Sequence, residues 1–479
     1  MSYLGPVSDF VTHQHSNPRG AAFLSPRLEI DNAQFLTKAA QTALLLQNAG
    51  VQQGDRVVLR LSVVAEAVAI VACMSLGLVS CHYTKQLSPD DYHRLGFRWI
   101  LTGDAGFESG GLKVLKMDLE ENPVESLELP TVGYSSDLET TRIIFSSGTT
   151  GTPKPIPFTL TQIRERSKHL LENVMNPSPF YSLMGFDVSL GYMTYMACLF
   201  SGKPFLSASS VPEQLALASQ WGVGSLGVSP LILETILKAP PGILERMENL
   251  RKIYSTGGQL PNSLHSKARQ ALGVEVVSLY GSTEVGFIAE RSTNISEAGD
   301  VGNILNYAHV EIVDQNDLPL PEGKTGSIRV QTPWMATKYE GDDSSSVAFR
   351  GGYFYPGDRG RLEGNRLFID GRDNLIVNSS GLKIDPSDVE AFCRDLPEPV
   401  QSAGFEHTTA DGSSIFVLAV ESLQTDLLKD LTSRLNKKFG PAAPRAYFVV
   451  SELPRNSLGK PLRKILSKEY SQQRDRMSQ

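Results

Sequence analysis

The sequence predicts an α/β protein in two parts: a large N-terminal domain of α/β layers with a β-rich subdomain, and a small mobile α+β domain at the C-terminal end. Short apolar runs alternate with helical patterns over most of the chain, which is typical of α/β architecture. After Val301, strand-like runs separated by turns predominate. The length of 479 residues also favours two or three domains over one.

The first helix is predicted to begin after Asp31, an acidic cap that Gln34 follows three residues later. Apolar residues then recur at helical spacing until Gly50: Phe35, Leu36, Ala39, Ala40, Ala43 and Leu44. The same patterns predict a strand over residues 56–61, helices over 163–174 and 261–272, and a strand over 274–279. Pro261 opens the last of these helices and Gly273 closes it.

Residues 63–79 form the most apolar stretch of the chain. The stretch contains Glu66, is rich in Ala, Ser and Gly, and falls short of the roughly 20 strongly apolar residues that a membrane span needs. It therefore predicts a buried helix of the α/β domain, and we expect no membrane insertion.

The later part of the chain is predicted to contain strands near residues 310–313 and 327–330, with a turn at 321–323. The last hundred or so residues alternate helix, strand, helix and strand, over 388–393, 415–420, 427–439 and 446–450. We expect a domain boundary between residues 1–370 and residues 371–479, where the chain reads DGRD.

Composition and charge narrow the functional classes. Hydrophobic residues make up 41% and charged residues 20%, as in a soluble globular protein. The net charge of -7 argues against a nucleic-acid partner, which would favour a basic face. The four cysteines form no CxxC pair, and the N-terminus has no signal-peptide pattern. We therefore expect reduced thiols and a cytoplasmic location.

The strongest local motif is SSGTTGTPK at residues 146–154, which follows the apolar residues 143–145. Glycines let a loop bend tightly and bring its N–H groups close to an anion. The hydroxyl groups add donors, and Lys154 adds a mobile positive charge. This combination suits a polyphosphate, and the alternative is a flexible polar turn. The stretch is not a Walker loop, because Pro153 takes the place of the second glycine.

This motif resembles the phosphate loop of adenylate-forming enzymes, the superfamily of acyl-CoA synthetases, peptide-synthetase adenylation domains and beetle luciferases. The resemblance implies a stand-alone ligase that uses ATP and Mg²⁺ to activate an acid. It also implies that one set of residues in the loop binds ATP: Ser147, Gly148, Thr149, Thr150, Gly151 and Lys154. Further motifs should then follow in a fixed order.

The next motif of the superfamily is matched by YGSTE at residues 280–284. The resemblance implies that Tyr280 stacks on adenine and that Thr283 contacts the α-phosphate. It also implies that Glu284, together with Thr149, holds Mg²⁺, and a carboxylate with phosphate oxygens is the usual ligand set of this ion. Read alone, YGSTE is a strand-to-loop turn.

Two further stretches resemble the nucleoside-binding motifs. TGGQ at residues 256–259 resembles the small-residue segment beside adenine and would contribute Gly257 and Gly258. YPGD ends at Asp358, which by resemblance accepts bonds from both ribose hydroxyls. Arg372 matches an arginine near the ribose.

LPRNSLGK at residues 453–460 resembles the C-terminal motif that carries the catalytic lysine. Lys460 can neutralise the attacking carboxylate and bridge to the α-phosphate, while Mg²⁺ and Lys154 offset the leaving charge. Lys460, Thr283 and Glu284 are therefore the predicted catalytic residues. In this reading, residues 1–370 bind ATP and the acid, and residues 371–479 form a mobile lid that carries the lysine.

The superfamily resemblance also implies a second step, in which the lid rotates and a thiol takes the acyl group. SGLKI at residues 380–384 matches the loop that then lines the pantetheine tunnel, with Gly381 and Lys383. The hinge departs from the usual Gly-Arg-x-Asp, because Asp373 is followed by Asn374. Either the hinge has shifted by one residue or thiolation is altered.

The acid is predicted from FDVS at residues 186–189, which resembles a motif of amino-acid-activating members. Its Asp187 would pair with the ammonium group of the substrate, or would alternatively cap the following helix. The pocket should also be lined at Val228 and Ser229, where nothing suggests a second carboxylate. An amino acid or another amino-bearing acid is thus slightly favoured.

Several readings of the function stay open at this stage. The acceptor thiol is a separate carrier protein or CoA. An aryl- or alkyl-acid CoA ligase is the alternative in which Asp187 is structural. A nucleotide-binding homologue without catalysis is a third reading, against which the intact Lys460, Glu284 and Asp358 argue.

Overall fold

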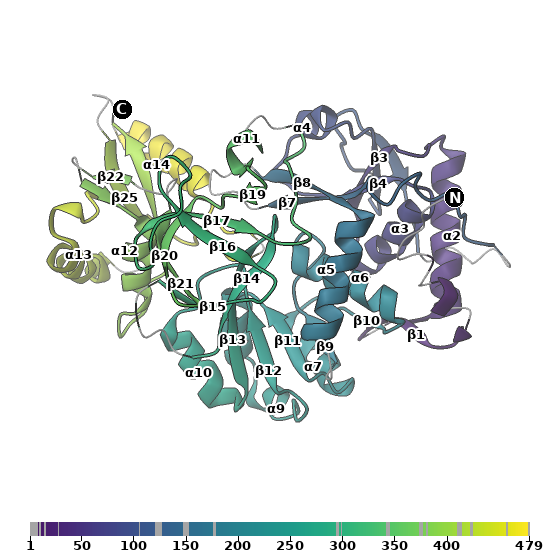
Figure 1. Cartoon of the computed structure of the whole chain (residues 1–479), viewed down its shortest axis with the longest axis horizontal. Helices are drawn as coiled ribbons and strands as arrows, with labels where there is room; N and C mark the ends of the chain where they lie inside the picture. Colours follow the sequence, from purple (N-terminus) through teal and green to yellow (C-terminus); the bar gives the residue numbers. More distant parts are fainter. Residues whose placement is uncertain are drawn as a thin grey trace.

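The computed structural model describes residues 8, 11–13, 16–26, 28–104, 106–119, 127–146, 153–175, 179–293, 297, 299–341, 345–372, 377–379, 382–409, 414–421, 425–456 and 458–477. Two large sheets and a smaller C-terminal group of elements make up this part of the chain. The α/β prediction is confirmed, and the elements follow the chain from one side of the molecule to the other (Figure 1).

The first large sheet has the strand order β6-β5-β3-β4-β7-β8 and is parallel except for the β7–β8 pair. Its strands are β3 (Arg56–Arg60), β4 (Val79–His82), β5 (Trp99–Thr102), β6 (Lys113–Lys116), β7 (Thr140–Ser146) and β8 (Lys154–Thr159). Its helices are α2 (Asn32–Asn48), α3 (Val63–Ser75) and α4 (Pro89–Arg94). A small sheet beside it joins β1 (Ala21–Ser25), β2 (Leu28–Asp31) and β10 (Phe205–Leu206).

Helices α2 and α3 form as the sequence predicts. Asp31 and Gln34 make a reciprocal capping box at the start of α2. Helix α3 is buried on almost all sides, which explains its apolar sequence without a membrane. One expectation for α2 was wrong, because Leu44 is 39% exposed. Leu44 lies about 100° around the helix from Ala43, and the buried stripe continues to Leu46 instead.

The second large sheet follows the order β18-β19-β17-β20-β21-β15-β14-β13-β12-β11-β9, with β16 beside β17. Its first strands are β9 (Phe180–Ser182), β11 (Ser225–Val228), β12 (Lys252–Ser255), β13 (Glu275–Ser282), β14 (Gly286–Arg291) and β15 (Asp300–Ile304). The others are β16 (His309–Val313), β17 (Gly326–Gln331), β18 (Phe349–Arg350), β19 (Tyr353–Phe354), β20 (Asp358–Glu363) and β21 (Arg366–Arg372). The β-rich region expected after Val301 is thus an antiparallel extension of a sheet that begins parallel.

Helices α7 (Val211–Gln220), α8 (Pro230–Leu237), α9 (Pro241–Leu244) and α10 (Asn262–Leu272) belong to the same part of the chain, and α11 (Ser345–Ala348) is a single turn. Helix α10 ends at Gly273 in the left-handed conformation, as predicted. Strand β13 is longer than predicted and includes Tyr280, Gly281 and Ser282. This part of the YGSTE motif therefore lies in the sheet and not after it.

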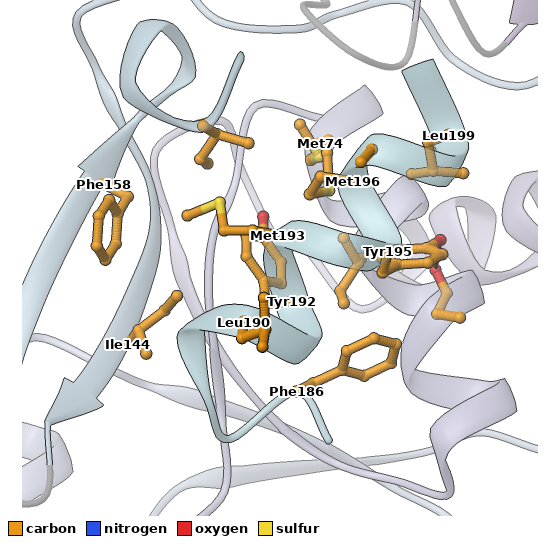
Figure 2. Packing of buried hydrophobic residues seen from close by; sticks show 14 of the residues in the cluster. Met74, Ile144, Phe158, Phe186, Leu190, Tyr192, Met193, Tyr195, Met196 and Leu199 are labelled. Carbon is orange, nitrogen blue, oxygen red and sulfur yellow. Dashed lines mark hydrogen bonds between the residues drawn. The ribbon is translucent and has the colours of Figure 1, made fainter. Parts of the chain in front are cut away.

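Two helices, α5 (Leu160–Asn173) and α6 (Ser189–Ser201), lie between the two large sheets (Figure 1). They pack against each other, and one apolar core joins them to both sheets. Figure 2 shows Tyr192, Met193 and Met196 of α6 in this core, with Ile144 of β7 and Phe158 of β8 on one side. This layered core fixes the ends of β7, β8, β13 and β14, where the sequence motifs lie.

The C-terminal elements form around the sheet of β24 (Ser402–Thr408), β25 (Ser414–Glu421) and β26 (Ala446–Val450). Alternate residues of β25 face two separate apolar clusters, with Phe416, Leu418 and Val420 in one and Val417 and Ala419 in the other. Around the sheet lie the short pair β22 (Val377–Ser379) and β23 (Leu382–Ile384) and helices α12 (Pro386–Arg394), α13 (Thr425–Phe439), η1 (Gly440–Ala442) and α14 (Arg463–Met477).

The helices and strands expected in this segment are present, but β22, β23 and β24 were missed. Strand β21 ends at Arg372 and therefore crosses residue 370, where the domain boundary is expected. That boundary stays a prediction. Within the described residues, no helix is long and apolar enough to cross a membrane.

Candidate functional site

A cavity of about 590 Å³ opens beside the end of strand β13 and gathers residues that are far apart in the sequence. Among the residues that line it are Lys154, Gly257, Tyr280, Thr283, Glu284, Asp358, Arg372 and Lys460. Most of the sequence motifs therefore meet at one place. The size is ordinary for a small-molecule site.

Asp358 is the centre of a bonded group at one end of the cavity. The carboxylate is 2% exposed and accepts bonds on both oxygens, from the Tyr280 hydroxyl at 2.5 Å and from Arg372 Nε at 2.6 Å. Burial beside this carboxylate raises the pKa of Tyr280 well above its ordinary value, so the phenol keeps its proton. The aspartate is thus held in one orientation at the cavity wall.

The backbone around Glu284 is held by a buried arginine that the sequence reading missed. Arg166 of α5 donates from Nη1 to the Thr283 carbonyl at 2.8 Å and from Nη2 to the Glu284 carbonyl at 2.7 Å. The Glu284 carbonyl also accepts a bond from the Ala336 N–H at 2.7 Å. A signal for Arg166 was present, because this residue lies on the buried face of α5 between Ile163 and Leu170.

The Glu284 side chain is oriented by a second residue that was missed. Tyr339 donates its hydroxyl to Glu284 Oε1 at 2.9 Å, and both residues are buried. The Tyr339 ring lies 4.6 Å from Lys154 Nζ, as in a cation–π contact. One side chain therefore positions the carboxylate and the lysine together.

The residues around Glu284 fit a magnesium ion that arrives with a phosphate ligand. Among the described residues, no group of three or more His, Cys, Asp and Glu could hold a metal alone. Mg²⁺ commonly takes one or two carboxylates and completes its shell with phosphate oxygens and water. A single buried, oriented carboxylate in an open cavity matches that pattern.

Lys460 reaches the cavity on the loop between β26 and α14. Asn456 shapes this loop by accepting the Lys460 N–H on its side-chain oxygen at 2.9 Å. Leu458 of the loop packs on Gly257, where a Cβ atom would stand only 3.1 Å from Leu458 Cδ2. Burial lowers the pKa of the Lys460 ammonium to about 8, although Asp358 and Glu284 act in the opposite direction.

The residues predicted to bind the acid are not those that line the cavity. Asp187, Val228 and Ser229 are absent from its described walls. Ser229 is buried and caps α8 by accepting the Ile232 N–H at 3.2 Å. The N-cap residue of α6 is Val188, and no side chain caps that helix. Asp187 therefore does not have the capping role that was the alternative.

Burial lowers the pKa of His82, but Glu66 and, to a smaller extent, the charge of Asp187 raise it overall. The neighbouring Phe186 packs into the core, with its ring 5.1 Å from Tyr195 and 5.5 Å from Phe205 (Figure 2). Residues 185–188 form a turn, in which the Val188 N–H donates to the Gly185 carbonyl at 3.2 Å. Phe186 of this turn is buried, whereas Asp187 does not line the cavity. Val188 and Ser189 line the cavity in its place.

Gly258 also does not line the described cavity. Several predicted site residues lie outside the described residues: Ser147, Gly148, Thr149, Thr150, Gly151, Asp373, Asn374 and Gly381. Lys383 belongs to β23, where it pairs with Asn378.

Comparison with known proteins places a nucleotide-binding family model on part of the chain that lines the cavity. Residues 114–340 match the model of the family described as AMP-binding enzyme. The chain is 25% identical over 344 residues to the acyl-CoA ligase M9 of a Phoma species, a match that covers 67% of this chain and 62% of that protein. It is 23% identical over 497 residues to a 4-chlorobenzoate–CoA ligase of an Arthrobacter species, covering 95% of this chain and 93% of the relative.

Among solved structures, the fold is similar to that of o-succinylbenzoate coenzyme A synthetase (MenE) from Bacillus subtilis in complex with ATP and a magnesium ion. The TM-score is 0.79 at 21% identity, and the match covers 95% of this chain and 98% of the other. At this identity the likeness shows the fold.

Proposed function

We propose that the protein is an ATP-dependent acid–thiol ligase, because residues 114–340 match the AMP-binding enzyme model. In the first step, an acid carboxylate attacks the α-phosphorus of ATP, which forms an acyl adenylate and releases pyrophosphate. In the second step, a thiol attacks the acyl carbon, which forms a thioester and releases AMP and a proton. The observation that carries the proposal is the convergence of Glu284, Asp358 and Lys460 on one cavity.

Each of these cavity residues has a separate role in the first step. Asp358, fixed by Tyr280 and Arg372, is placed to accept bonds from the ribose hydroxyls. Lys460 supplies positive charge where the carboxylate and the α-phosphate must approach each other. Lys154 faces the leaving pyrophosphate. Bound at Glu284, Mg²⁺ would neutralise phosphate charge.

CoA is the proposed acceptor, because the curated relatives named above are CoA ligases. A carrier protein that presents phosphopantetheine is the second candidate. Residues 371–479 act as the lid in this proposal. The contacts of Leu458 with Gly257 and of Gly459 with Leu231 would then close the lid for the first step.

The reaction is tested by pyrophosphate exchange into ATP with a panel of carboxylic acids, followed by product analysis with CoA or with a carrier protein. An acid-dependent exchange and a CoA thioester are expected. Exchange with no acid in the panel would contradict the proposed function. A thioester formed only on the carrier protein would contradict CoA as the acceptor.

Deprotonation of Lys460 should lower the activity of the enzyme at alkaline pH. The ammonium form supplies the charge, and the pKa in the free site is lowered to about 8. We therefore expect kcat/KM for ATP, measured by exchange, to fall as pH rises through about 8. Lys460→Arg keeps a positive charge that is not lost in this pH range. Whatever activity this variant retains should therefore not fall as pH rises through about 8. If kcat/KM of the arginine variant fell with pH in the same way, the fall would belong to the titration of another group.

Tyr339→Phe should weaken the response to Mg²⁺ while the aromatic ring under Lys154 is kept. Hydrogen bonds to charged groups contribute roughly 1.5–3 kcal/mol, so the Mg²⁺ concentration for half-maximal exchange should rise about tenfold or more. Tyr195→Phe is a matched control, because it removes a buried hydroxyl that donates to the Ala67 carbonyl at 2.7 Å outside the cavity. Equal shifts in both variants would show that Tyr339 has no specific role at Glu284.

A further inference from the structure

A wall of three aromatic side chains borders the cavity where α5 approaches the loop after β17. His169, Tyr307 and Trp334 contact one another, with ring centroids 4.5 Å apart for His169 and Tyr307 and 4.8 Å apart for Tyr307 and Trp334. His169 and Trp334 are 5.1 Å apart. We call these three residues the aromatic wall, and all of them line the cavity.

The cavity around the aromatic wall is otherwise mostly apolar. The apolar residues that α5, α6, the N-cap of α6 and β14 add to it include Leu170, Val188, Leu190, Met193, Phe287 and Ile288. Leu190 and Met193 lie on α6, and both belong to the apolar core that packs around this helix (Figure 2). Thioether and aromatic surfaces of this kind pack well against a flat ring.

The charge of Glu172 reaches His169 and that of Glu290 reaches Tyr307, but neither carboxylate is among the described residues that line the cavity. Arg166 is a cation that bonds the backbone of the wall residue Trp334, and its Nε, Nη1 and Nη2 donate to the carbonyls of Trp334, Thr283 and Glu284. Burial lowers the pKa of His169, so the imidazole is neutral at pH 7. Asp187 lies outside the described lining. A substrate ammonium or second carboxylate would therefore lose its hydration without gaining a partner.

We propose, resting on the proposed function, that the acid is an aromatic monocarboxylate without a charged substituent, and that its ring packs on the aromatic wall and Met193. This replaces the slight preference for an amino acid that the sequence suggested through Asp187. The carboxylate end remains toward Lys460, where the adenylate forms.

The proposal is tested by pyrophosphate exchange with four acids of matched size. The probes are 3-phenylpropanoate, 3-cyclohexylpropanoate, phenylalanine and phenylsuccinate. They share one skeleton and differ in aromaticity, in an added ammonium or in an added carboxylate. We expect kcat/KM for phenylpropanoate to exceed that for the cyclohexyl acid at least threefold and that for both charged acids at least a hundredfold. Phenylalanine or phenylsuccinate as the best substrate, or a cyclohexyl acid equal to the aromatic one, would overturn the proposal.

The role of the wall itself is tested by Trp334→Leu. We expect kcat/KM to fall at least threefold more for phenylpropanoate than for its cyclohexyl counterpart, mainly through KM. Trp221→Leu is the matched control, because Trp221 is 39% exposed and does not line the cavity. An equal loss of kcat/KM for both acids in the Trp334 variant would contradict the packing of the substrate ring on the aromatic wall. Failure of all four acids, with exchange on another acid of the wider panel, would also overturn this proposal. Exchange with no acid of that panel would instead overturn the proposed function, so the two failures are distinguishable.

Discussion

Replacing Lys460 with alanine is expected to lower the rate of acid-dependent pyrophosphate exchange by about two to three orders of magnitude. The two reacting groups both carry negative charge, and Lys460 is the lysine that the C-terminal loop brings to their meeting point. Loss of one preorganised contact to developing charge typically costs roughly 3–4 kcal/mol of transition-state stabilisation.

The loss should appear in kcat and not in stability. Lys460 makes its loop contact through the backbone N–H, which alanine keeps. The thermal midpoint should therefore stay close to that of the wild type. Lys468→Ala removes an exposed lysine of α14 and serves as the matched control, with wild-type exchange expected. Exchange at the wild-type rate in the Lys460 variant would remove this residue from the chemistry.

Replacing Arg142 with methionine is expected to destabilise the fold by about 3–5 kcal/mol, because it leaves a buried carboxylate without its cation. Arg142 and Glu66 are 0% and 1% exposed, and Arg142 Nη2 donates to Glu66 Oε1 at 2.8 Å. Arg142 also donates to Ser80 Oγ at 3.2 Å and lies over the Tyr192 ring. The free energy of unfolding in urea measures the effect.

His82 keeps a contact with the same carboxylate in the methionine variant, at 2.7 Å from Glu66 Oε2. Burial alone would lower the pKa of His82, but the attraction and hydrogen bond of Glu66 raise it overall. This imidazole is partly exposed and cannot replace a buried guanidinium. A double variant, Glu66→Gln with Arg142→Met, should recover much of the lost stability, since no charge is left unpaired.

A surface ion pair provides the contrast for this prediction. Lys238 and Glu234 are one helical turn apart, with Lys238 exposed and Glu234 partly exposed, so Lys238→Met should change the free energy of unfolding by less than about 1 kcal/mol. If Arg142→Met had an equally small effect, the Glu66–Arg142 pair would not stabilise the two elements that it joins, α3 and β7.

The sequence alone determined the local features and the order of the motifs. The capping box of Asp31 and Gln34 and the end of α10 at Gly273 depend on contacts within a few residues, so the pattern suffices to predict them. The same holds for the strand expected over residues 415–420, which lies within β25. The motif residues Tyr280, Glu284, Asp358 and Lys460 were also identified, and the structure brings them to one cavity.

Only the tertiary structure decided which other side chains meet these residues. Tyr339 bonds Glu284 across 55 positions of the sequence, and Arg166 reaches the Thr283 carbonyl across 117. Neither pairing has a local pattern. Asp187 is absent from the described cavity lining, whereas the adjacent Phe186 is buried in a core built from α6 and β10. The role predicted for Asp187 stays a prediction. Short-range hydrogen bonds and periodicity are encoded locally, whereas the packing of sheets and helices decides which distant side chains share a cavity.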